Sequence, residues 1–247
     1  MRIVLGISIV IFWAAMTATF FEEHILPDIE LQAELCYRTA LVKQLKADEY
    51  TMKILFLNQK VGESRTSIEP SNDGGCSISN VTQMAFPELG DAGTMSMEMV
   101  SRLDSSFRLR SVTMTVKSAI MNARIVGTAS QNSLRLTFRT QDGTTDADIP
   151  LTGHETLSDG LSPFINMPHL AVGKEWDIFM IDPLTLTSCR RRARVEEMET
   201  IQWRGEDCET FLVTLEVSKT QKIRAWIDRE GRVLREEIGP GLALERE

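Results

Sequence analysis

The sequence predicts a mainly β protein, in which an N-terminal transmembrane helix and a following helix precede a strongly curved antiparallel meander or partial β-barrel with a short helical insert. Three observations predict this fold. An uncharged apolar run stands at the N-terminus, apolar and polar residues alternate with period two after Tyr50, and turn-forming residues separate the alternating segments. We expect three parts, residues 1–21, 22–49 and 50–247.

Composition narrows the class of protein. The chain has 247 residues, of which 43% are hydrophobic and 25% charged, and these values are ordinary for a globular protein. Only one apolar run is long enough to span a bilayer, which excludes a polytopic membrane protein. The net charge of -8 argues against a nucleic-acid partner, because phosphate binding needs a basic surface.

The apolar run predicts a membrane signal-anchor. Residues 3–21 carry no charge and just reach the length of about 20 residues that a transmembrane helix needs. Arg2 precedes the run and Glu22 and Glu23 follow it, so the positive-inside rule places the rest of the chain outside the cytoplasm. A cleaved signal peptide is the alternative, but the small residues of a cleavage site fit poorly near its end.

Residues 22–49 predict a helical linker or juxtamembrane helix. The segment lacks glycine and is rich in Leu, Ala, Glu, Lys and Gln, which are good helix formers. Pro27 suits the first turn of a helix, and Asp28 adds a negative charge where the helix dipole favours one.

Residues 50–247 predict a β-rich extracytoplasmic domain of about ten strands. Turn residues at 58–60, 71–75, 142–143 and 228–231 separate segments such as TMSMEMV, FRLRSVTMTV and FLVTLEV. Residues 157–170 break the alternation, and Pro163 and Pro168 are expected to bound a short helix there. So many strands are expected to curl, because sheet twist accumulates and edges need protection.

The four cysteines leave the disulfide state open. Cys36, Cys76, Cys189 and Cys208 form no C-x-x-C pair and have no histidine at metal-ligand spacing. A bridge between Cys189 and Cys208 is not favoured, because a turn at residues 204–206 places Cys208 opposite a residue near Ile201. Free buried thiols are as well supported as a disulfide, although an extracytoplasmic compartment permits one.

A methionine-rich strand face is the first candidate binding surface. Met95, Met97 and Met99 alternate along one predicted strand and therefore face the same side, and Met114 continues the pattern on the next strand. Methionine lines adaptable apolar surfaces, so the face predicts a site for a lipid-like ligand, held against the 157–170 insert. The alternative is that these methionines belong to the ordinary hydrophobic core and bind no ligand.

An arginine-rich strand is the second candidate. Arg190, Arg192 and Arg194 share one face of a predicted strand, which suits an anionic partner or lipid headgroups. The alternative is a solvated face that pairs with Glu196, Glu197 and neighbouring acidic strands.

Several segments, in the same order, resemble the extracytoplasmic N-terminal β-domain of bacterial transglutaminase-like membrane proteins. They are LFLNQKVGESRTSIE, FRLRSVTMTV, GKEWDIFMIDPLTLT and RAWIDREGRVLREEIGPGLALERE, within residues 50–247. More loosely, they resemble an uncharacterised family of bacterial envelope β-proteins. The chain stops at Glu247, where the catalytic domain would begin, so the resemblance implies the accessory domain without the enzyme, and a protein of the bacterial inner membrane with its C-terminal domain in the periplasm.

No catalytic, cofactor or metal motif is recognisable. His24, His154 and His169 lie far from any cysteine at a helix start, and no P-loop, dinucleotide fingerprint or nucleophile elbow is present. We therefore expect a non-catalytic membrane-anchored envelope protein that binds or scaffolds a partner protein. A carrier or sensor of a lipid-like ligand is the alternative, and a thiol-dependent enzyme is the third hypothesis.

Overall fold

The computed structural model describes residues 47–247, except residues 87–89, 91–92, 107, 120, 131, 152–154, 157–161, 165–169, 183–186 and 218–220, and at 155–156, 179–182 and 187–190 it describes only the backbone. The predicted signal-anchor, nearly all of the predicted helix at 22–49 and most of the 157–170 insert lie outside these residues. Within the described residues, no helix has the length and apolar character needed to cross a membrane.

The first half of the described chain forms eight consecutive strands that follow one another as hairpins. They are β1 (Asp48–Phe56), β2 (Gln59–Pro70), β3 (Cys76–Ala85), β4 (Thr94–Leu103), β5 (Leu109–Ser118), β6 (Asn122–Ala129), β7 (Ser133–Thr140) and β8 (Thr144–Pro150).

The second half forms seven strands. They are β9 (Glu155–Thr156), β10 (Glu175–Asp182), β11 (Thr187–Trp203), β12 (Glu206–Glu216), β13 (Lys222–Asp228), β14 (Val233–Gly239) and β15 (Leu242–Arg246). The prediction of about ten strands was therefore too low, since short strands such as β8 and β15 alternate too briefly to be distinguished by pattern. The predicted helix end at Glu49 was also wrong, because Asp48 and Glu49 already pair with Ile68 and Ser67 of β2.

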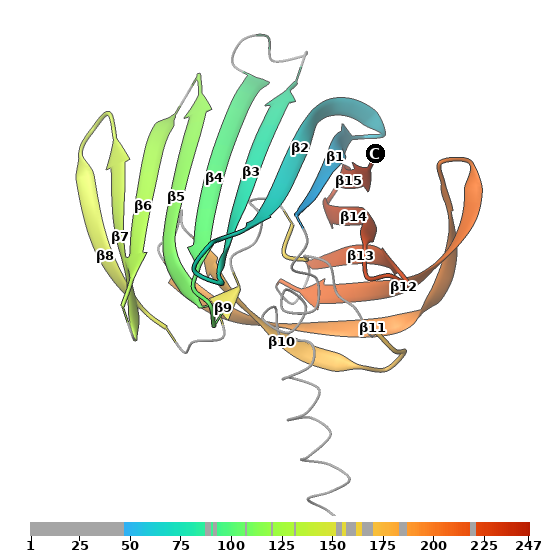
Figure 1. Ribbon diagram of the computed structural model, residues 1–247. Coiled ribbons are helices and arrows are strands. Elements are labelled where there is room, and N and C mark those ends of the chain that lie inside the picture. Colours follow the sequence, from blue (N-terminus) through green and yellow to red (C-terminus); the bar gives the residue numbers. More distant parts are fainter. Residues whose placement is uncertain are drawn as a thin grey trace, which may run out of the picture.

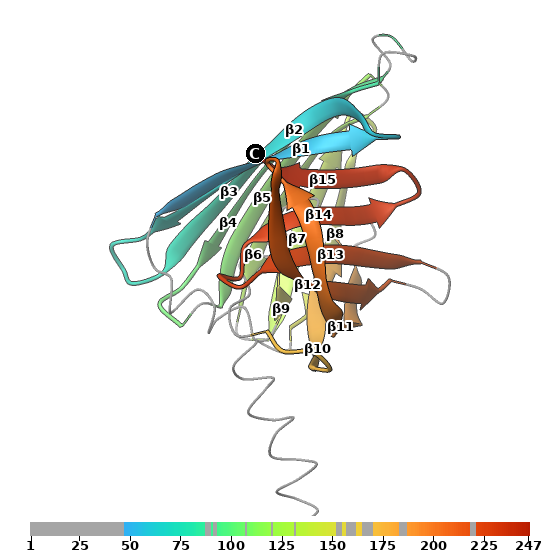
Figure 2. The same ribbon diagram turned by 90° about the vertical axis from the view of Figure 1, so that its right-hand side faces the viewer.

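All fifteen strands belong to one sheet, in the order β8-β7-β6-β5-β4-β3-β2-β1-β15-β14-β13-β12-β11-β10-β9. Two meanders meet side by side at the pair β1–β15, and every pair is antiparallel except β9–β10. Figure 1 shows β1–β8 along one wall and β10–β15 curling below and beside it, and Figure 2 shows the second wall in front of the first. The predicted curved antiparallel meander is confirmed.

Bulges supply part of this curvature. The strand registers shift between β1 and β2, β4 and β5, β11 and β12, β13 and β14, and β14 and β15. A bulge bends its strand and increases the local twist. Four of these five described shifts lie in the stretch from β11 through β15 to β2, where the sheet turns back, and β8 ends up close to β11.

The predicted hairpin turns are found, but the first lies at Leu57–Asn58 and not at residues 58–60, because Gln59 and Lys60 already pair with β1. Leu57 and Asn58 have φ angles of 50° and 65°, and Arg204 and Gly205 have 54° and 83°. Two consecutive left-handed residues match the right-handed twist of the flanking strands. The second turn places Cys208 opposite Ile201, as the sequence predicted.

The concave face holds the core in two main clusters. One joins residues of β1 and β10–β15 with Phe164 and Leu170, and the other lies on β4–β8. Ser162 and Phe164, within the predicted helical insert, are buried, and the Ser162 hydroxyl hydrogen-bonds Glu236 Oε1. The Phe164 N–H donates to Ser162 Oγ at 3.0 Å. These contacts fix this part of the insert inside the curved sheet.

A buried polar network crosses β2 and β3 on the same concave face. Asn80 Nδ2 donates to Ser64 Oγ at 2.8 Å and to Thr66 Oγ1 at 3.0 Å. Thr82 Oγ1 hydrogen-bonds Ser64 Oγ at 2.9 Å and Asn80 Oδ1 at 2.8 Å. Buried polar groups cost free energy unless they find partners, so this network favours one register of β2 on β3.

Gly62 lets β2 approach β3 closely. A Cβ atom at this position would stand 2.1 Å from the Gln83 carbonyl oxygen and 2.7 Å from Met84 Cα. Both are backbone atoms of the neighbouring strand, and they cannot rotate away as the end of a side chain would. The position therefore excludes any residue with a side chain unless the two strands separate.

We predict that Gly62→Ala lowers the free energy of unfolding by about 1–3 kcal/mol, the usual cost of overpacking. Urea unfolding followed by circular dichroism measures it. Gly239→Ala is the matched control, because its Cβ would meet only Gln221 Nε2, at 3.8 Å. Equal stability of the two variants would contradict the close approach.

Candidate functional site

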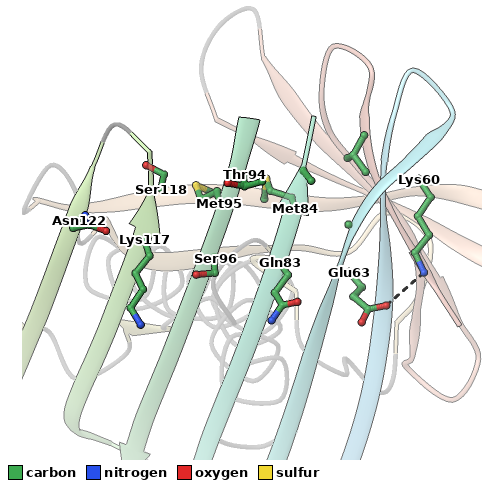
Figure 3. A pocket seen from close by; sticks show the side chains of 13 residues that line it. Lys60, Glu63, Gln83, Met84, Thr94, Met95, Ser96, Lys117, Ser118 and Asn122 are labelled. Carbon is green, nitrogen blue, oxygen red and sulfur yellow. Dashed lines mark hydrogen bonds and ion pairs between the residues drawn. The ribbon is translucent and has the colours of Figure 1, made fainter. Parts of the chain in front are cut away.

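An open groove of about 600 Å³ lies at the ends of β2–β5 and forms the candidate site. Figure 3 shows Met84 and Met95 together at one level of the sheet and Gln83, Ser96 and Lys117 at the next. We call it the rim groove. It is lined by Lys60, Val61, Gly62, Glu63, Gln83, Met84, Ala85, Thr94, Met95, Ser96, Lys117, Ser118 and Asn122.

Strand register explains the mixed chemistry of the rim groove. Met84 is paired with Met95, so the two thioether side chains share the concave face of the sheet. Gln83 is paired with Ser96, and Ser96 with Lys117, so these polar side chains share the opposite face. The groove therefore combines an apolar wall from one face with a polar wall from the other.

A bulge completes the apolar wall. Ile54 pairs with Gly62 and Leu55 with Lys60, so Val61 is the extra residue on β2. Val61 is half-buried and packs against the core cluster of β1 and β10–β15. The bulge thus turns an apolar side chain toward the core beside Gly62, where β2 approaches β3 closely.

Two lysines give the groove its positive charge. Lys60 Nζ lies 3.4 Å from both Glu63 Oε2 and Glu247 Oε1, and its hydrogen bond to Glu247 raises the pKa of Lys60. Lys117 is exposed and makes no ion pair with any residue that the structure describes. Lys117 is therefore the cation of the groove with its charge still available to a ligand.

The four candidate methionines lie together as predicted, but only one of them reaches the groove. Met99 is paired with Met114, and Met97, Met99 and Met114 are buried in the core of β4–β8. Met95, half-buried at the end of the strand, lines the rim groove. The methionine face is thus core along most of its length and accessible at its end.

The arginine-rich strand is β11, and its described side chains are engaged with acidic neighbours. Arg192 lies 3.8 Å from Glu175 and 4.0 Å from Asp177, while Arg194 lies 3.5 Å from Glu175 and 3.4 Å from Glu196. This arrangement agrees with the alternative of a solvated, charge-paired strand face. The side chain of Arg190 lies outside the described atoms.

Two of the cysteines are described, and both carry free thiols. Burial raises the pKa of the Cys76 thiol to about 11. Burial, with a smaller contribution from Asp228, also raises the pKa of Cys208. A nucleophilic thiol needs a lowered pKa, so these two residues lack the electrostatics of a catalytic cysteine.

Metal-ligating residues do not gather in the described part of the chain, where no group of three or more His, Cys, Asp or Glu residues is arranged to hold an ion. All three histidines, His24, His154 and His169, and Cys36 lie outside the described residues, and of Cys189 only the backbone is described.

Sequence reasoning missed Lys60, Met84 and Lys117 as groove residues. Each lies near the end of its strand, and only the pairing of β2, β3, β4 and β5 brings them together. Among the groove residues, the local sequence pattern identified only Met95, because alternation along its strand places it on the apolar face.

Comparison with known proteins gives three structural likenesses. No family model matches the chain, and no curated protein matches its sequence. A beta-barrel-like protein of the DUF1849 domain of unknown function from Brucella abortus is 8% identical, with a TM-score of 0.48, over 82% of this chain and 95% of that one.

Two further structures match with lower scores. A DUF1089 family protein from Pseudomonas aeruginosa is 16% identical, with a TM-score of 0.39, over 72% of this chain and 90% of that one. The hypothetical lipoprotein YmcC from Escherichia coli is 14% identical, with a TM-score of 0.27, over 94% of this chain and 92% of that one.

We predict that iodoacetamide labels Cys208 well before Cys76 in the folded protein at neutral pH. Cys76 is 1% exposed and its raised pKa leaves little thiolate, which is the reactive form. Mass spectrometry of timed samples measures the order, and denatured protein, in which both thiols react alike, is the control. Labelling of Cys76 at its denatured rate would contradict its burial.

Proposed function

We propose that this chain is a non-catalytic, membrane-anchored protein of the bacterial cell envelope that binds a lipid-like ligand in the rim groove. The observation that carries the proposal is the pairing of an apolar wall, Met84 and Met95, with Lys117 in one groove of about 600 Å³. The anchoring and the compartment rest on the uncharged run at residues 3–21 and on the resemblance to extracytoplasmic β-domains.

The chemistry of the groove suits a ligand with an apolar body and an anionic end. Its volume falls in the range of small-molecule sites, about 300–1,000 Å³. Each methylene group transferred from water to the methionine wall contributes about 0.8 kcal/mol. Lys117 would then attract the anionic end, while Gln83, Ser96 and Asn122 offer hydrogen bonds. The described lining contains neither histidine nor cysteine, so it lacks the thiol and imidazole of a thiol-dependent enzyme.

We predict that cis-parinarate, a fluorescent acyl carboxylate, binds the full-length protein saturably and that Met95→Glu weakens this binding at least tenfold. The new carboxylate would repel the probe and hydrate the apolar wall. Lys117→Gln is expected to weaken binding about threefold, since a charge attraction at an exposed site contributes less than about 1 kcal/mol. Fluorescence titration in nonionic detergent measures both.

Matched controls exist on the other wall. Met198 is 43% exposed on β11, and Lys222 is exposed on β13 next to Glu216 at 3.4 Å. Met198→Glu and Lys222→Gln repeat the two chemical changes away from the groove and should leave the affinity unchanged. The proposal fails if parinarate does not bind, or if the groove variants bind as well as their controls.

Binding or scaffolding of a partner protein is the second candidate, and Leu57 favours it. Leu57 is 68% exposed at the tip of the β1–β2 hairpin, in a left-handed conformation that costs a leucine free energy. Its N–H donates to the Gly241 carbonyl at 2.8 Å, which fixes the tip against the β14–β15 turn. A fixed, exposed apolar tip is a suitable contact for another protein.

We predict that Leu57→Asn removes a cross-linked partner from the protein in intact membranes without lowering its thermal stability. Asparagine adopts the left-handed conformation more readily than leucine, so the variant keeps the turn. Cross-linking followed by mass spectrometry measures the partner. Val172→Asn, at another exposed apolar side chain, is the control. Retention of the same partner by Leu57→Asn would exclude the tip as its contact.

A further inference from the structure

A second pocket of about 550 Å³ lies where β1 meets β15 and β2. We call it the Arg246 pocket. Arg246 is paired with Met52 across β15 and β1, and Thr51 is paired with Arg65 across β1 and β2. The lining consists of Glu49, Tyr50, Thr51, Arg65, Arg246 and Glu247.

Arg246 is a half-buried cation with no carboxylate in direct contact among the described residues, and the charges of Asp48 and Asp228 act on it only from beyond ion-pair distance. Its guanidinium carbon lies 4.4 Å from the centre of the Tyr50 ring, so the aromatic ring supports its position. Burial lowers the pKa of Arg246 below its ordinary value. Among the residues that the structure describes, its guanidinium makes neither an ion pair nor a side-chain hydrogen bond.

Arg232, just before β14, and Arg235, within β14, differ from Arg246 in this respect. Arg235 lies over the Trp226 ring at 5.6 Å, but it also pairs with Glu237 at 3.3 Å and Glu245 at 3.6 Å. Arg232 pairs with Asp228 at 2.6 Å. Stacking on an aromatic ring therefore accompanies carboxylate partners at Arg235, whereas no described carboxylate lies within ion-pair distance of Arg246.

The acidic residues that line the pocket are committed to other cations. Glu49 lies 3.7 Å from Arg65, and Glu247 lies 3.4 Å from Lys60 and 4.0 Å from Lys53. A guanidinium carries five N–H donors. Burying it without hydrogen-bond acceptors for these donors is costly. The guanidinium of Arg246 therefore has room for an anionic hydrogen-bond acceptor beside it in this pocket.

We propose that the Arg246 pocket binds a phosphate or carboxylate group, with Arg246 as the anchoring residue. The planar guanidinium presents two parallel N–H groups that match the oxygens of either anion. Tyr50 holds the guanidinium, Arg65 from β2 balances the negative charge of Glu49, and the Thr51 hydroxyl offers a further donor. This site is separate from the rim groove and does not depend on the function proposed for it.

Calorimetric titration of the full-length protein in nonionic detergent with inorganic phosphate tests the site. Low ionic strength is needed, because salt screens partly exposed charges. We expect saturable binding to one site. Arg246→Gln should weaken it at least tenfold, and Arg246→Lys, which keeps the charge but not the planar fork, should weaken it less.

Arg65→Gln is a second variant that still tests the site if Arg246→Gln fails to fold. The Arg65 side chain is 60% exposed, so the substitution leaves the fold intact, and the Glu49 carboxylate that it leaves unbalanced should weaken phosphate binding several-fold. Arg235→Gln is the matched control, because it removes an arginine that also stacks on an aromatic ring but already has carboxylate partners. Its phosphate affinity should equal that of the wild type.

A parallel titration with detergent micelles containing phosphatidic acid, or phosphatidylcholine at the same mole fraction, distinguishes the source of the anion. Binding of free phosphate that depends on Arg246 assigns the pocket to a soluble anion. Binding of phosphatidic acid alone, with the same dependence, assigns it to a lipid headgroup. Absence of both, or equal affinity in Arg246→Gln, Arg65→Gln and wild type, overturns the proposal.

Discussion

In the part of the chain that the structure describes, one sheet has no second layer of strands or helices over its apolar face, and this constraint shapes the rest of the structure. The strands alternate so that one face is apolar, and water must be removed from that face to stabilise the fold. The sheet meets the constraint by bending until its walls face inward, with bulges at strands such as β1–β2 and β14–β15. Ile54, Ile125 and Val195, on strands far apart in the sheet order, are all fully buried as a result.

The curved sheet also encloses polar groups, and their partners make the interior specific. Glu236 is fully buried, and its hydrogen bond with Ser162 connects β14 to the segment that carries Phe164. A buried carboxyl group without partners would be costly, so this contact ties the insert to one position on the wall. On the other wall, Asn80 and its hydroxyl neighbours fix the register of β2 and β3. That register in turn places Met84 and Gln83 at the rim groove.

Local patterns in the sequence predicted the strands and turns but not the sites. Alternation placed Met95, Met97, Met99 and Met114 on one face, and turn residues placed Cys208 opposite Ile201, because both depend on neighbours within a hairpin. The requirement for glycine at position 62 depends on the backbone of β3, and no local pattern contains that information. Whether Arg246 has a carboxylate partner depends on which acidic residues the fold brings near it, and its stacking on Tyr50 joins strands from the two ends of the domain.

The pairing of β1 with β15 is therefore the long-range contact on which both candidate sites depend. It brings Glu247 to Lys60, which neutralises one lysine of the rim groove and leaves Lys117 as the cation available to a ligand. The same pairing sets Arg246 over Tyr50, while Glu247 is engaged by Lys60, so no described carboxylate contacts the guanidinium directly. The distribution of charge around β1 follows from the topology of the sheet, because β15 reaches β1 only after the second meander is complete.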